Sequence, residues 1–175
     1  MRSSSLHVTA LAFFGLACAM DSPTTRRPDP GGFTPNATNS LGESVGFIER
    51  MPGFPRAVHR SRGGTMTDLG TLPGGFRSSA VAIDDAGTIV GQSETAAGRF
   101  RAVRWHRGVI QDLGTLPGGG FSVASAIAGD TVFGESDAGG GALHAFRWVD
   151  GRMADLGRFS APGAAVAPQR RPDRR

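Results

Sequence analysis

The sequence has no lysine or tyrosine and contains one cysteine, Cys18. A single cysteine excludes an intrachain disulfide, so packing alone must hold the folded part of the chain together. Because lysine is absent, all 19 basic side chains are arginine. We interpret this as the coding bias of a GC-rich genome rather than as a device for binding.

A continuous basic stripe is also missing. The formal net charge is +4, and the C-terminal tail supplies +3 of it through four arginines and one aspartate. In the rest of the chain acidic and basic residues are interspersed, which disfavours the phosphate contacts that nucleic-acid binding requires. We therefore expect no nucleic-acid partner.

The composition also leaves little room for long helices. The chain contains 27 glycines and 11 prolines, and both residue types favour turns and interrupt helices. This predicts many short strands joined by tight turns.

The N-terminus has the pattern of an export signal. The apolar run over 6–17 is too short to span a bilayer but suits the hydrophobic region of a signal peptide. Small residues around Cys18 fit cleavage before Met20, so we predict a signal peptide over 1–19 and a polar linker over 20–30. The alternative without export is a buried apolar helix.

Cys18 is also a candidate lipidation site. Gly15-Leu16-Ala17-Cys18 resembles a bacterial lipobox, except that Leu16 lies two residues before the cysteine instead of three. The chain is thus expected to be secreted or on the cell-envelope surface, and an outer-membrane lipoprotein is one form of the latter. A lipid anchor would be its only contact with a membrane.

Internal repetition is the strongest feature of the sequence. The tripeptide Asp-Leu-Gly recurs at intervals of 44 and 43 residues, which indicates a repeat architecture. The three copies are Asp68-Leu69-Gly70, Asp112-Leu113-Gly114 and Asp155-Leu156-Gly157, and the strands before the last two end in Trp105 and Trp148. We divide a repeat region over 31–160 into a degenerate copy at 31–70 and clear copies at 71–114 and 115–157. A disordered, arginine-rich tail is expected over 161–175.

These blocks resemble the HAF family of extracellular repeats. The run that gives the family its name is complete at His144-Ala145-Phe146, and Val-Gly-x-Ser, Gly-Gly and Asp-Leu-Gly elements accompany it in order. Asp84 stands where the family usually has asparagine. The resemblance implies an exported repeat protein to which no reaction is assigned.

Each copy predicts four short antiparallel strands. In the clearest copy these cover 77–84, 88–94, 99–105 and 109–113, and in the last copy Asp150-Gly151 is a typical hairpin turn. A four-stranded unit that repeats at this interval is typical of a β-propeller blade. We therefore predict an all-β fold of about three four-stranded, propeller-like blades, with a β-sandwich or a β-solenoid as alternatives.

Alternation along these strands predicts one bulky face and one small face, which would let adjacent blades nest. The predicted bulky face contains Val81, Ile83, Ile89, Val103 and Trp105, and the predicted small face contains Ala80, Ala82, Gly91 and Ala102. About three blades are fewer than the roughly four that a closed propeller needs. The chain is thus expected to be an incomplete or open propeller, either truncated relative to a longer family or assembling with other copies of itself.

Residues capable of chemistry are few. The recurring aspartates could bind a metal or a glycan, but an aspartate at the end of a strand more often accepts hydrogen bonds from the following turn. Trp105 and Trp148 could stack on sugars or anchor the core, and we favour the core. The histidines occupy different repeat positions and form no zinc spacing. We predict no catalytic, cofactor or metal site.

The sequence therefore predicts a non-enzymatic exported protein that serves as a binding or scaffolding module. Its extracellular ligand is expected to be a glycan or a protein, and self-assembly is a further expectation. One alternative is a fragment of a longer HAF-repeat propeller without a function of its own. The other is a hydrolase-like propeller enzyme.

Overall fold

The fold is all-β. The computed structural model describes residues 32–49 and 51–158, and these residues contain twelve strands and no helix. Within them there is accordingly no helix long and apolar enough to cross a membrane. The predicted signal peptide with Cys18, the linker and the arginine-rich tail lie outside the described residues.

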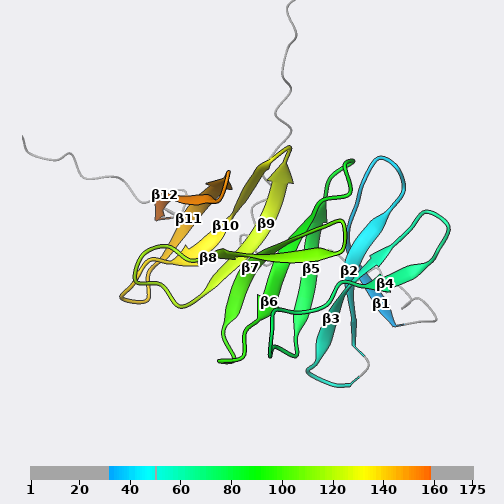
Figure 1. The fold of residues 1–175 in the computed structure, drawn as a ribbon, viewed down its shortest axis with the longest axis horizontal. Helices are drawn as coiled ribbons and strands as arrows, with labels where there is room; N and C mark the ends of the chain where they lie inside the picture. Colours follow the sequence, from blue (N-terminus) through cyan, green and yellow to red (C-terminus); the bar gives the residue numbers. More distant parts are fainter. Residues whose placement is uncertain (1–31, 50, 159–175) are drawn as a thin grey trace, which may run out of the picture.

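The twelve strands form three separate four-stranded sheets (Figure 1). The first sheet contains β1 (Phe33–Thr38), β2 (Ser44–Glu49), β3 (Pro55–Arg60) and β4 (Met66–Asp68). The second contains β5 (Ser78–Ile83), β6 (Ile89–Glu94), β7 (Phe100–His106) and β8 (Val109–Gly114). The third contains β9 (Ser122–Ala128), β10 (Thr131–Asp137), β11 (Leu143–Val149) and β12 (Arg152–Arg158).

Every sheet is an antiparallel meander in which neighbours in the chain are neighbours in the sheet. The predicted three four-stranded antiparallel units are therefore confirmed. The degenerate first copy also forms a complete sheet, although its last strand has only three residues. The first copy therefore forms the same hydrogen-bonded sheet despite its weak sequence repetition.

Two hairpin turns connect the third and fourth strands of the second and third sheets. Asp150 and Gly151 have φ angles of 50° and 79°, and Arg107 and Gly108 have φ angles of 51° and 77°. Positive φ at both central residues is the property of a type I′ turn, whose twist matches that of the flanking strands. The predicted turn at Asp150-Gly151 is confirmed.

The sheets stack face to face in chain order (Figure 1). The first strand of each following sheet provides much of the contact: β5 packs on β1, β2 and β3, and β9 packs on β5, β6 and β7. The stack is open, and none of the three sheets closes into a barrel.

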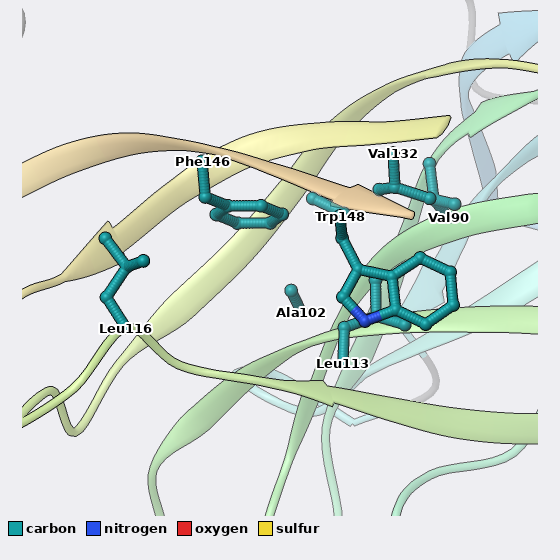
Figure 2. Packing of buried hydrophobic residues seen from close by; sticks show 8 residues of the cluster. Val90, Ala102, Leu113, Leu116, Val132, Phe146 and Trp148 are labelled. Atoms are coloured by element: carbon teal, nitrogen blue, oxygen red, sulfur yellow. The ribbon is translucent and has the colours of Figure 1, made fainter. Parts of the chain in front are cut away.

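Bulky side chains of one sheet fill the space left by small side chains of the sheet before it. Phe146 and Trp148 of β11 pack over the small Ala102 and also against Leu113 of the second sheet (Figure 2). At the preceding interface, Trp105 belongs to the cluster that contains Ala57 of the first sheet. This is the large-against-small nesting that the alternation predicts.

The predicted membership of the two faces is wrong at three positions. Ala80 lies in the same cluster as Trp105, and Gly91 pairs with Val103, so both belong to the bulky face. A β-bulge between Ala80 and Ala82 is the cause, because the extra residue Val81 breaks the alternation and belongs to neither cluster. Gly91 lies two residues after Ile89 in the same strand, so both residues belong to the bulky face.

Glycine is required opposite this bulge. A Cβ atom on Gly91 would collide with the carbonyl oxygen of Ser79, and one on Gly46 would collide with that of Thr34. Gly134 has the same restriction in the third sheet. The glycine of the Val-Gly-x-Ser block thus permits the close approach of the bulged first strand.

Candidate functional site: a polar groove between the second and third sheets

The three repeated aspartates have a structural role. The backbone N–H of Gly70 donates to Asp68 Oδ1 at 2.8 Å, and the same bond joins Gly114 to Asp112 and Gly157 to Asp155. Each aspartate thus stabilises the turn that follows its strand. This is the structural role that the sequence favours over metal or glycan binding.

Two of these aspartates also contact a basic side chain on the neighbouring strand. Arg56 lies 3.2 Å from Asp68, and His144 Nδ1 lies 2.8 Å from Asp155 Oδ2. The hydrogen bond from Gly157, together with His144, lowers the pKa of Asp155. The carboxylates are therefore already engaged within their own sheets.

The remaining residues of the repeated blocks divide between core and surface. Gly70, Gly114 and Gly157 adopt positive φ angles of 80° to 90°. Leu113 is buried, Leu69 is partly buried against the first interface, and Leu156 is exposed. In the His144-Ala145-Phe146 run, Phe146 is fully buried while His144 and Ala145 are half-buried.

The two tryptophans are core residues. Trp105 is 2% exposed and Trp148 is 4% exposed, and each lies within one of the two inter-sheet clusters. Rings buried in this way offer no free face on which a sugar could stack. They anchor the interfaces between sheets.

The three histidines that the structure describes do not contact one another. His106 Nδ1 lies 3.0 Å from Thr88 Oγ1, His59 lies 3.5 Å from Glu43, and His144 is paired with Asp155. Across residues 32–49 and 51–158, no three His, Cys, Asp or Glu side chains gather closely enough to hold a metal ion. Asp84 accepts a hydrogen bond from the Thr88 N–H in the β5–β6 turn.

Four buried serines hold the sheets together, and the sequence-based reasoning missed their role. Ser122 Oγ accepts a hydrogen bond from Ala102 N–H of the preceding sheet and donates one to the Gly114 carbonyl. Ser78 makes the same pair of bonds one interface earlier, to Ala57 and Gly70. We call this arrangement the serine bridge. Its periodic spacing was the only sign of it in the sequence.

The second pair of serines fixes the connecting segments. Ser93 Oγ accepts a hydrogen bond from Leu72 N–H at 2.8 Å, and Ser136 Oγ accepts one from Leu116 N–H at 2.9 Å. Ser93 belongs to the Val-Gly-x-Ser block, and Ser136 occupies the same position in Phe133-Gly134-Glu135-Ser136. The serine at this position therefore fixes the segment that connects one sheet to the next.

A polar groove lies where the second and third sheets meet, at the end that carries the tight hairpin turns. Its volume is about 360 Å³, within the range of roughly 300–1,000 Å³ typical of ligand sites. The lining residues are Arg104, Gln111, Asp130, Trp148, Asp150 and Gly151. They come from strands and turns of both sheets, so no single repeat contains the groove.

Arg104 forms the floor of the groove. Its guanidinium lies over the Trp148 ring, with Cζ 5.2 Å from the ring centroid, and its Nε is buried without a hydrogen-bond partner. Stacking on an indole holds a guanidinium in place and leaves the N–H groups at its outer edge available. Gln111 pairs with Arg104 across the β7–β8 ladder.

Two carboxylates stand at the exposed rim. Asp130 lies in the β9–β10 turn, and Asp150 is held by its positive φ in the β11–β12 turn. The groove thus combines acceptors at the rim with donors at the floor. Such a set can hydrogen-bond a neutral polyhydroxyl compound, whose hydroxyl groups both donate and accept.

The chain matches no protein-family model, no curated protein and no solved structure.

Proposed function

We propose that this chain is a non-enzymatic, exported repeat protein of the HAF type that binds a glycan in the groove between its second and third sheets. The observation that carries the proposal is the lining of the groove, which brings the donors of Arg104 and Gln111 together with the acceptors of Asp130 and Asp150. Paired donors and acceptors match adjacent sugar hydroxyls. Here the sugar is held through its hydroxyls, because the Trp148 face is taken by Arg104.

A glycan array followed by titration calorimetry tests this proposal. Replacing both rim acids, Asp130→Ala with Asp150→Asn, should weaken binding of the best glycan by about tenfold or more, because hydrogen bonds to charged groups are worth about 1.5–3 kcal/mol. Asparagine at position 150 tolerates the positive φ of the turn. Glu135→Gln is the matched control, since Glu135 does not line the groove.

Blank wells across the array would overturn the glycan proposal. Equal affinities of the double variant and the parent protein would remove the groove as its site. Selective capture of a protein ligand that depends on the same two acids would replace the glycan with a protein partner.

Export is the second part of the proposal and depends on residues outside the described part. Mass spectrometry of the protein made in its host, with and without globomycin, measures the mature N-terminus. A chain that begins at a diacylated Cys18 supports a lipid anchor, and an unmodified chain that begins at Met20 supports free secretion. Retention of residues 1–19 would contradict export by either route.

A further inference from the structure

The outer face of the third sheet carries apolar side chains whose counterparts in the second sheet are buried. Phe133 is 36% exposed and Leu156 is 55% exposed, whereas the equivalent Val90 and Leu113 are 0% and 6% exposed. The equivalence follows from the ladders, because Phe133 pairs with Arg147 as Val90 pairs with Arg104. In the second sheet this face is covered by the third sheet.

The third sheet repeats the backbone geometry that receives a serine bridge. Ala145 pairs with Gly157, and a bulge follows between Ala145 and Phe146. In the second sheet, Ala102 pairs with Gly114 and the same bulge follows, and Ser122 binds there to the N–H of Ala102 and the carbonyl of Gly114. The outer face of the third sheet therefore has the backbone arrangement, at Ala145 and Gly157, to which the serine of a serine bridge binds in the second sheet.

The first sheet is different at the positions that supply the bridge. Phe33 pairs with Ile48 in β1 and β2, where the second sheet pairs Ser78 with Ser93. Phe33, Ile48 and Val58 form a separate buried cluster. The first sheet thus lacks the serines that would form a serine bridge.

We propose that the outer face of the third sheet docks a four-stranded blade of the same repeat type from a second polypeptide. The docking blade carries serines at the positions of Ser122 and Ser136, and its first strand lies across Phe133, Ala145 and Leu156. Both serine-bearing sheets of this sequence already use their serines. The occupant is therefore none of the three described sheets. The proposal is independent of the glycan groove, which faces the opposite side of the third sheet.

The test uses the full chain with residues 115–158 duplicated after Arg158 and a protease site in the duplicated connector. The tether supplies the extra blade at high local concentration. With the duplicated copies of Phe133 and Leu156 replaced by alanine, hydroxyl-radical labelling of the original Phe133 and Leu156 should fall several-fold relative to the parent protein. After cleavage the extra blade is a separate polypeptide, and it should still co-elute with the parent in size-exclusion chromatography.

Two variants identify the contacts. Leu156→Asp should abolish co-elution, and Ser→Ala at the duplicated counterpart of Ser122 should weaken it. Leu41→Asp, which changes an exposed leucine in the β1–β2 turn, should leave co-elution unchanged. Unchanged labelling, separation of the blade after cleavage or retention unaffected by Leu156→Asp would each overturn the proposal. An extra blade that stays unfolded when tethered beside this face would also overturn the proposal.

Discussion

At the scale of single residues, the serine bridge explains why a hydroxyl stands inside an otherwise apolar interface. A β-bulge at Leu113 in the fourth strand of the second sheet lies beside the Ala102 N–H and the Gly114 carbonyl, which face the third sheet. Serine has one donor and two acceptor sites on a very small side chain, so it satisfies both groups without opening a gap. Leaving such buried groups without partners costs free energy.

Ser122→Ala should therefore lower the free energy of unfolding by about 1–3 kcal/mol, since it leaves Ala102 N–H and the Gly114 carbonyl without their hydroxyl partner. Urea unfolding followed by circular dichroism measures the change. Ser79→Ala is the control, because Ser79 is half-buried and should change stability by less than about 0.5 kcal/mol. Equal effects of the two variants would contradict the role of the bridge.

Gly91→Ala should lower the free energy of unfolding by at least about 1–3 kcal/mol, because the new Cβ would collide with the rigid carbonyl of Ser79. A control at an open position is Gly63→Ala, where the nearest atom is 3.9 Å away and φ is not positive. That change should be neutral or stabilise by about 0.4–1 kcal/mol through the unfolded chain. Thermal melts of both proteins distinguish the outcomes.

At the scale of elements, the segments that connect the sheets are fixed by acids at the ends of second strands. Glu94, at the end of β6, accepts hydrogen bonds from the N–H groups of Phe76 and Arg77 and pairs with the Arg77 guanidinium at 2.7 Å. Asp137, at the end of β10, accepts one from Gly120 N–H. An acid here orders the connector, which in turn positions the first strand of the next sheet.

This arrangement predicts a specific acid sensitivity. The hydrogen bond from Arg77 holds the pKa of Glu94 below its ordinary value of 4.5. A lowered folded-state pKa stabilises the fold above the unfolded-state pKa, and this contribution is lost as the pH falls through the folded-state pKa. Between pH 7 and 2, the stability of Glu94→Gln should therefore decline less steeply than that of the parent protein.

Urea midpoints at a series of pH values measure this difference. Asp85 and Asp155 also have lowered pKa values, so both proteins should lose stability in acid and only the difference between them reports on Glu94. Parallel pH profiles would contradict the prediction.

The elements themselves were largely predictable from the sequence, and the site was not. Alternation and turn residues placed β6 and β8 to within a residue at each end, because strand period and glycine turns are local properties. The bulge at Val81 has no local signature, so the faces of β5 were misassigned. The groove brings Arg104 and Asp130 together from different repeats. Aligning the repeats shows which residues share a repeat position, but it does not show which residues of different repeats lie side by side in space.

At the scale of the whole molecule, an open stack has two unequal ends. The first sheet replaces the serines of the repeat with Phe33 and Ile48, and the third sheet keeps the receiving geometry and exposes Leu156. In repeat proteins stability is close to a sum over units and their nearest-neighbour interfaces. A residue at the same repeat position should therefore contribute much more to the free energy of unfolding inside the stack than at its open end.

Leu113 and Leu156 occupy that position in the second and third sheets, at 6% and 55% exposure. Leu113→Ala should lower the free energy of unfolding by about 2–5 kcal/mol, because it opens a cavity between two sheets. Leu156→Ala should cost less than about 1 kcal/mol, since most of that side chain is already in water. Urea unfolding of both variants in the absence of other proteins gives the comparison. Equal losses would mean that the outer face of the third sheet is covered in the isolated chain.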